Sequence, residues 1–281
     1  MRLRTVEKGD GFFPALLIRF ISMVSGMRLP DAARIVMYHP DFYGNPMSTW
    51  THAAMRGESP WSVGERELFA AMTAEWNACP FCMGVHGAIA SLVLDKGTLS
   101  PKMHAMLAFL EIFTKTPDAV TVEQVRTFTP REVEDAMAVA TLFSITARCA
   151  NAFDFAILNE RDLSRGAKRM LVQGYVFGKR KPQGPPDHRA LADELHKHVL
   201  EGPGITDSAL RQAMASRAAG GPSLEEAAYD DLALQIGQAS YKVTDGQVRK
   251  VVQKAGSEKA AFELMVAAAV GAGFYRWRQA T

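Results

Sequence analysis

Residues 79–86 read Cys-Pro-Phe-Cys-Met-Gly-Val-His, and Glu67 stands twelve residues before the first of these cysteines. This stretch and Glu67 together supply two thiols, an imidazole and a carboxylate within twenty residues of a chain that has only three cysteines. Thiol-based redox chemistry needs these groups: a nucleophilic sulfur, a second sulfur that closes a disulfide, and a base with a proton path.

The residue types predict that this stretch begins a helix. Proline suits the first helical position, where its missing N–H is not needed, so Pro80 makes Cys79 the N-cap and places Cys82 in the first turn. Both sulfurs then lie near the positive end of the helix dipole, which favours thiolate over thiol. His86 follows Cys82 by four residues on the same face and can accept or relay its proton.

A second helical run, from Glu67 to Trp76, precedes the cysteines and is expected to end near Asn77. If this run packs against the cysteine helix, Glu67 either orients His86 or accepts its proton. Glu75 also lies close to the cysteines in sequence and is an alternative for the same role.

The spacing of these residues resembles the alkylhydroperoxidase AhpD-like group within the carboxymuconolactone decarboxylase family. The pattern of this group is a glutamate followed, twelve positions later, by the first cysteine of a Cys-x-x-Cys-x-x-x-His motif. Residues 64–70 resemble its lead-in helix, and residues 120–155 resemble the helices that follow the motif in peroxidase-related members. The four matching positions are Glu67, Cys79, Cys82 and His86.

The resemblance implies an all-α, AhpD-like helical fold, a homo-oligomer, and reduction of hydroperoxides through a Cys79–Cys82 disulfide that an external dithiol reduces again. It implies Glu67 and His86 as the proton relay and no cofactor or metal. In the family view Cys82 meets the peroxide and Cys79 resolves it. Dithiol chemistry alone would instead make Cys79, expected to be more exposed, the sulfur that exchanges with the reductant.

Other interpretations stay open at this point. Cys79, Cys82 and His86 are candidate ligands of a structural zinc, although no second cysteine pair exists. The pair could also be buried and inert, or serve a non-catalytic redox sensor or scaffold. Decarboxylation or isomerisation of a lactone-like acid would use His86 and Glu67 without sulfur, but decarboxylase members of the family typically lack the cysteines. Cys149, alone on an apolar helix face, is expected to be a core residue.

Composition sets looser bounds on the class of protein. A chain of 281 residues predicts about two units, and 48% hydrophobic with 22% charged residues is ordinary for a globular protein. A net charge of +2 gives no reason to expect nucleic acid. Few cysteines fit a reducing compartment, so a cytoplasmic location is expected.

The N-terminal residues suggest a further helix. Phe12 to Val24 is apolar and follows three basic residues, but Pro14 and Arg19 interrupt it, so an amphipathic packing or interfacial helix is expected rather than a signal peptide. No uninterrupted run of eighteen apolar residues occurs, so no membrane span is predicted.

Apolar residues recur at spacings of three and four along the remaining chain, which predicts helix after helix. Thr129-Pro-Arg-Glu has the pattern of a capping box. Thr121-Val-Glu-Gln-Val is echoed by Thr244-Asp-Gly-Gln-Val, which indicates a diverged duplication whose second copy lacks the cysteines. The predicted organisation is an N-terminal helical segment at 1–29, an AhpD-like catalytic domain at 30–177, a linker at 178–187, and a degenerate helical half at 188–281.

Three histidines, His188, His196 and His198, gather near one predicted helix. Side chains two residues apart on a helix point about 200° apart, so they form a poor metal chelate. A solvated surface position is expected for them.

Overall fold

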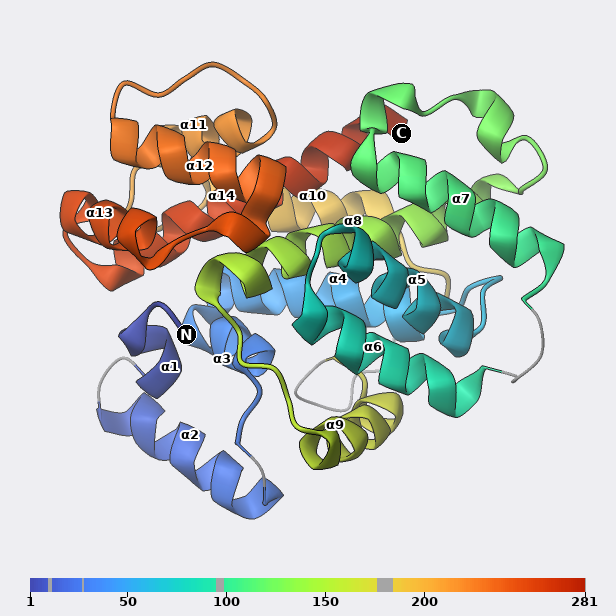
Figure 1. Cartoon of the computed structure of the whole chain (residues 1–281), viewed down its shortest axis with the longest axis horizontal. Coiled ribbons are helices and arrows are strands. Elements are labelled where there is room, and N and C mark those ends of the chain that lie inside the picture. The colour runs from blue at the N-terminus through green and yellow to red at the C-terminus, as the bar shows by residue number, and fades with distance from the viewer. Residues whose placement is uncertain (10–11, 27, 95–98, 176–183, 281) are drawn as a thin grey trace. The chain divides into compact units, whose positions relative to one another are not determined.

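The computed structural model describes residues 1–9, 12–26, 28–94, 99–175 and 184–280, and within these ranges it contains helices and connecting turns but no strand (Figure 1). The all-α prediction is confirmed. The α-helices are α1 (Arg4–Lys8), α2 (Phe12–Ser25), α3 (Asp31–Tyr38), α4 (Asn45–Arg56), α5 (Val63–Trp76), α6 (Pro80–Val93), α7 (Pro101–Lys115), α8 (Pro130–Phe153), α9 (Glu160–Gln173), α10 (His188–His196), α11 (Ser208–Ala218), α12 (Ala227–Ala239), α13 (Asp245–Ala255) and α14 (Glu258–Ala280). Short π-helices (Pro40–Gly44, Lys197–Glu201) and 3-10 helices (Pro117–Ala119, Val122–Val125, Ser240–Lys242) complete the list.

The chain divides into two compact units, each assembled from three separate segments. The first unit comprises Met1–Met47, Arg148–Leu158 and Glu194–Ala272, and the second comprises Ser48–Ala147, Asn159–Asp193 and Gly273–Thr281. The domains predicted from the sequence are continuous stretches of the chain, whereas each of these units combines three separate stretches. Residues 178–183 of the predicted linker lie outside the described residues.

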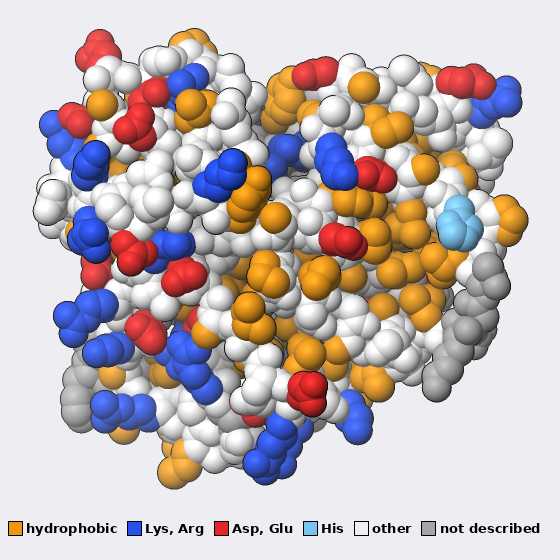
Figure 2. Space-filling model, in the orientation of Figure 1, with side chains coloured by type: hydrophobic (Ala, Val, Ile, Leu, Met, Phe, Trp, Pro, Cys, Tyr) orange, Lys and Arg blue, Asp and Glu red, His pale blue; other side chains and the backbone are white. Residues whose placement is uncertain are grey.

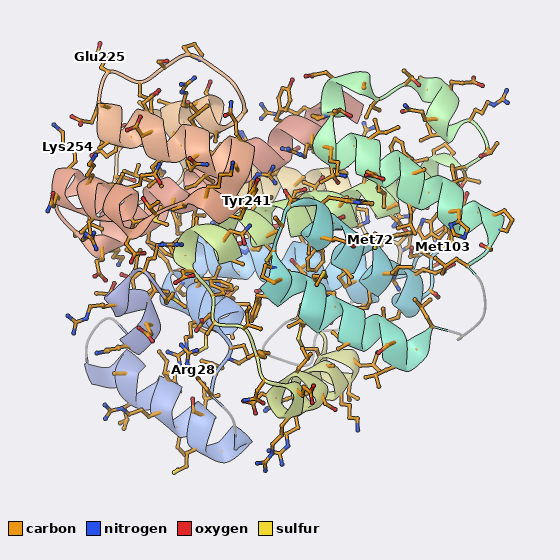
Figure 3. The ribbon with its side chains drawn as sticks, in the orientation of Figure 1. Arg28, Met72, Met103, Glu225, Tyr241 and Lys254 are labelled. Carbon is orange, nitrogen blue, oxygen red and sulfur yellow. The ribbon has the colours of Figure 1, made fainter. Side chains whose placement is uncertain are left out.

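The second unit contains the cysteine motif and is built around α5, α6, α7 and part of α8. Ser62 and Glu65 form a capping box that starts α5, with the Glu65 N–H 3.3 Å from Ser62 Oγ and the Ser62 N–H 2.7 Å from Glu65 Oε2. Met72 of α5 and Met103 of α7 are labelled in Figure 3, and Met103 is buried. The fully buried apolar side chains of this unit include Phe69, Ile89, Met106, Leu110, Phe113 and Val139.

The capping box predicted before α8 is present. The Thr129 N–H donates to Glu132 Oε2 at 2.8 Å, and the Glu132 N–H donates to Thr129 Oγ1 at 3.3 Å. In the described part of the chain, α8 is the one helix that is long enough and apolar enough to cross a membrane, judged by length and composition alone. However, 89% of its most apolar stretch of 18 residues is buried inside the protein. Such burial is typical of a core helix. Cys149 lies on α8 and is fully buried, as expected.

His188 contradicts the expectation of a solvated surface position. Its side chain is fully buried, with Nε2 3.1 Å from Asp135 Oδ1 and Nδ1 accepting a hydrogen bond from Trp50 Nε1 at 3.2 Å. The prediction was wrong because it considered only neighbours on the same helix, whereas α8 and α4 supply both partners. His196 and His198 are partly exposed.

A buried arginine ties the start of α5 to the end of α4 in the second unit. Arg66 lies four residues after the N-cap Ser62, and its guanidinium donates to the carbonyls of Ala54 and Gly57, each at 2.9 Å. These carbonyls have no partner within α4, because they belong to its last turn and to the residue that follows it. Arg66 thus satisfies backbone acceptors that would otherwise be buried unpaired.

The first unit repeats this arrangement with other residues. Arg211 lies four residues after the N-cap Asp207, and donates to the carbonyls of Val199, at 2.8 Å, and of Gly202. The arginine follows the glycine by nine residues in both units. The recurrence adds a structural observation in favour of the duplication predicted from the sequence, which stays a prediction.

The corresponding helix start in the first unit carries no thiol chemistry. Glu226 is the N-cap of α12 and accepts a hydrogen bond from the backbone of the first turn, as Cys79 does at the start of α6. Counted from these N-caps, Tyr229 occupies the position of Cys82 and Ala233 that of His86. The cysteine motif is therefore confined to the second unit.

Glu263 is a fully buried carboxylate in the first unit. It accepts hydrogen bonds from the backbone N–H groups of Ile205 and Thr206, each at 2.9 Å, and lies 3.3 Å from His39 Nε2. Burial works to raise the pKa of Glu263, but the hydrogen bonds from His39, Thr206 and Ile205 outweigh it and lower the pKa to about 2.

The low pKa of Glu263 predicts an acid-dependent loss of stability. Because the folded-state pKa of about 2 lies below the ordinary value of 4.5, the stabilisation is complete above that ordinary value and is lost as pH falls toward 2. The free energy of unfolding should drop by about 3 kcal/mol from this group over that range. In Glu263→Gln this part of the acid dependence should be absent in chemical denaturation at several pH values, while Glu225→Gln, at an exposed site (Figure 3), should retain it. An unchanged acid limb in Glu263→Gln would contradict the assignment.

Candidate active site

The turn between α5 and α6 places both cysteines at a helix start. Asn77 ends α5, Ala78 adopts a left-handed conformation with φ of 51°, and the Cys79 N–H donates to the carbonyl of Ala74 at 2.9 Å. Cys79 is then the N-cap of α6, and its sulfur accepts the Cys82 N–H at 3.4 Å. The predicted cap, with Pro80 in the first helical turn, is confirmed.

Cys79 and Cys82 approach within 3.1 Å of each other and are not joined by a disulfide. The hydrogen bond from the Cys82 side chain lowers the pKa of Cys79; burial acts in the opposite direction, and backbone N–H groups of Cys82 and Phe81 lower the pKa further. The lowered pKa favours the thiolate form of Cys79 relative to that of an ordinary cysteine. The expectation that Cys79 is more exposed was wrong, because each cysteine is only 1% exposed.

His86 and Glu67 form a buried pair beside the cysteines. His86 Nδ1 lies 2.7 Å from Glu67 Oε2, and the two side chains are almost fully buried. Burial works to raise the pKa of Glu67, but the hydrogen bond and charge of His86 and the charge of Arg56 lower it more, so the pKa lies below its usual value. An ionised carboxylate only accepts, so Nδ1 of His86 carries the hydrogen of this hydrogen bond, whichever form the ring takes.

Two residues that the sequence interpretation missed complete the carboxylate's surroundings. Arg56, the last residue of α4, places its guanidinium 2.8 Å from Glu67 Oε1. The Tyr175 hydroxyl donates to the same oxygen at 2.9 Å and lies 3.3 Å from His86 Nδ1. Burial, and then the charge of Glu67, raise the pKa of Tyr175 well above its usual value, so this hydroxyl keeps its proton at neutral pH and donates a hydrogen bond.

A glycine allows Tyr175 to reach the pair. Gly174 ends α9 with φ of 72°, a conformation that favours glycine, and an added Cβ would lie 2.6 Å from the His52 ring. The Tyr175 N–H donates to His52 Nδ1 at 3.3 Å. Burial, and then the charge of Arg56, lower the pKa of His52, which keeps its ring neutral and able to accept this hydrogen bond.

No local pattern marks Arg56 or Tyr175 in the sequence. Arg56 has the appearance of a basic residue in the last turn of a helix, and Tyr175 lies 108 residues after Glu67. The one available signal is Gly174, a helix-ending glycine directly before an aromatic residue. It indicates a turn but not what the turn faces.

The remaining neighbours define how the site is enclosed. Phe143 of α8 packs edge-on against the His86 ring, with ring centroids 4.3 Å apart. Phe81 is buried, and Trp76 is half-buried. Glu75 is exposed, in contrast to the fully buried Glu67. The contacts of His86 therefore select Glu67, and the alternative that Glu75 shares this role finds no support in its position.

Among the residues that the structure describes, no group of three or more His, Cys, Asp or Glu side chains is placed to hold a metal ion.

Replacing Tyr175 by phenylalanine is expected to keep the ring and remove the hydrogen bond to Glu67. Because a donor to a carboxylate favours its ionised form, the pKa of Glu67 should rise when this donor is removed. The acidic limb of the pH profile for thiol reaction with hydroperoxide should shift upward with it. Tyr241→Phe, at an exposed position (Figure 3), is the matched control. A uniformly lower rate with an unmoved limb would show that Tyr175 only packs.

No family model matches the chain, and no curated protein matches it. Two solved structures are similar to this chain. One is an uncharacterized peroxidase-related protein from Silicibacter sp. TM1040, with 21% sequence identity and a TM-score of 0.44; the match covers 52% of this chain and 84% of that chain. The other is an alkylhydroperoxidase AhpD core, an uncharacterized peroxidase-related protein from Ralstonia eutropha JMP134, with 22% sequence identity and a TM-score of 0.42; the match covers 53% of this chain and 86% of that chain.

Proposed function

We propose that the protein is a thiol-dependent peroxidase that reduces hydroperoxides through the Cys79–Cys82 pair. The observation that supports this proposal best is the combination of two cysteines that approach within 3.1 Å and are not joined by a disulfide with a buried, hydrogen-bonded Glu67–His86 pair in the same unit. A disulfide needs two sulfurs that can approach to about 2 Å. These two require little movement to do so.

The proposed reaction begins at Cys82. His86, one helical turn further along α6, takes the thiol proton on Nε2, while Glu67 holds Nδ1 and stabilises the imidazolium that forms. The Cys82 thiolate attacks the terminal oxygen of the hydroperoxide, so that an S–O bond forms as the O–O bond breaks. The leaving alkoxide takes the proton from His86 and departs as an alcohol, and Cys82 becomes a sulfenic acid.

Cys79 then resolves this intermediate. Its lowered pKa favours the thiolate, which attacks the Cys82 sulfur. An S–S bond forms, hydroxide leaves, and a proton converts it to water. An external dithiol supplies two electrons and two protons to restore both thiols by disulfide exchange.

Burial of the cysteines restricts what reaches them. Each sulfur-bearing side chain is only 1% exposed. The reaction therefore requires local opening over the first turn of α6, and the hydroperoxide is proposed to enter past Phe81 and Trp76. Its apolar surroundings favour an organic hydroperoxide. A cytoplasmic homo-oligomer is part of the same proposal.

Two other functions use the same residues. A redox sensor or scaffold would form the disulfide without turning over, and a lactone decarboxylase or isomerase would use the Glu67–His86 pair without sulfur. Steady-state turnover with dithiothreitol and cumene hydroperoxide separates them. A peroxidase consumes many equivalents of hydroperoxide, whereas a sensor consumes one equivalent and stops. Lactone turnover retained in a Cys79→Ser, Cys82→Ser double variant would favour acid–base chemistry instead.

A further inference from the structure

The α2 helix exposes its apolar side to solvent. Five large hydrophobic side chains along it are between 48% and 72% exposed, although exposed apolar side chains in globular proteins are normally scattered singly. They are Leu16, Leu17, Phe20, Met23 and Val24.

These positions recur at intervals of one, three and four residues, so they lie on one face of the helix. The opposite side, which carries Ile18 and Ile21, is partly covered within the first unit. A surface helix of a globular protein turns its apolar stripe inward and its polar residues outward. In α2 the outward face is itself apolar, so apolar side chains that are normally buried are exposed to solvent on this face.

Positive charge is concentrated around this helix. Residues 1–34 contain six Lys or Arg and three Asp or Glu, a net charge of +3, whereas the whole chain has a net charge of +2. Arg19 is exposed at the edge of the apolar face, and Lys8 and Arg28 flank the two ends of α2. Figure 2 shows blue and orange side chains together at the lower left, where α2 lies in Figure 1, and Arg28 is labelled in Figure 3.

We propose that α2 binds an anionic membrane surface, lying in the plane of the interface with its exposed apolar face among the acyl chains. Apolar insertion together with basic residues near lipid phosphates is the combination that holds interfacial helices. Helix α2, with 14 residues, is too short to span a bilayer, which needs about 20. The inference does not depend on the proposed peroxidase reaction.

A second copy of the chain fits this face less well. Five side chains are far fewer than the roughly 20–30 residues that each partner contributes to a stable interface. Two copies meeting through α2 would also bring two segments of net charge +3 together. An anionic bilayer removes that repulsion and adds attraction.

The test is co-sedimentation of the full-length protein with vesicles of phosphatidylcholine alone or of equimolar phosphatidylcholine and phosphatidylglycerol. We expect at least tenfold stronger binding to the anionic vesicles, weakened by salt. The double substitution Leu17→Glu, Phe20→Glu should reduce this binding at least tenfold. Arg19→Gln should reduce it about fivefold, the effect of about 1 kcal/mol per basic residue. Val122→Glu, at an exposed site outside α2, should leave it unchanged.

Two results would overturn the proposal. One is equal or absent binding of the unaltered protein to both kinds of vesicle. The other is self-association of the protein in solution that the double substitution abolishes, without vesicle binding, which would identify a second copy as the occupant. Arg19→Gln and the salt dependence keep the test valid if the double variant does not fold.

Discussion

Cys82→Ser is expected to lower steady-state hydroperoxide turnover with a supplied dithiol by about a thousandfold or more. Serine cannot form a stable anion near neutral pH, so the attack on the peroxide oxygen is lost. The measurement is consumption of cumene hydroperoxide under saturating dithiothreitol. Full turnover by this variant would contradict the assigned role of Cys82.

Single-cysteine variants also separate the two sulfurs. Cys79→Ser should lose turnover as well, but its Cys82 thiol should still be oxidised once, to a sulfenic acid that a dimedone probe traps. Cys149→Ser is the matched control, because Cys149 is fully buried on α8 in the other unit, and its turnover should be unchanged. A trapped sulfenic acid in Cys82→Ser but not in Cys79→Ser would reverse the proposed order of attack.

Glu67→Gln is expected to lower the same turnover by about a hundredfold. The amide keeps the size of the side chain but removes the charge that stabilises the His86 imidazolium, and it leaves the Arg56 guanidinium without its carboxylate partner. Glu75→Gln, on the same helix at an exposed site, should retain full activity.

The pH profile distinguishes this electrostatic role from packing. The pKa of Glu67 lies below its usual value. Glu67 is therefore ionised, and contributes to turnover, at pH values above the lowered pKa, and this contribution is lost as pH falls through it. An acidic limb assigned to this group should therefore be present in the unaltered protein and absent in Glu67→Gln. If turnover in Glu67→Gln equalled that of the unaltered protein, the relay through His86 would be excluded.

The sequence predicts the local part of the site well. The start of α6 follows from rules that act within one helical turn: proline at the first position, a capping side chain before it, and a histidine one turn after Cys82. The Glu67–His86 contact was a conditional expectation, because it depends on how α5 packs against α6. The structure fulfils that condition with a 2.7 Å hydrogen bond.

The sequence does not predict contacts that arrive from distant parts of the chain. Tyr175 reaches Glu67 only because Gly174 turns the chain at the end of α9, and Arg56 only because α4 ends beside α5. The prediction of a surface position for His188 was wrong for the same reason, since its hydrogen-bond partners lie in α4 and α8. Helical periodicity identifies which face of a helix is apolar but not which other helix covers it.

The assembly of each unit from separate chain segments was likewise not predicted from the sequence. Each unit gathers three segments, so a prediction that reads the chain from one end to the other cannot recover them. The matching arginines, Arg66 and Arg211, were also not predicted: each joins a helix start to the end of the preceding helix, and this pairing becomes visible only through their hydrogen bonds.

The most direct test of the central claim is mass spectrometry of the protein after one equivalent of an organic hydroperoxide, with both thiols counted before and after. We predict rapid loss of two thiols and a peptide pair joined by a Cys79–Cys82 disulfide, with Cys149 still reduced. Unreacted Cys79 and Cys82, in protein whose thiols react with a small alkylating reagent under the same conditions, would contradict the account.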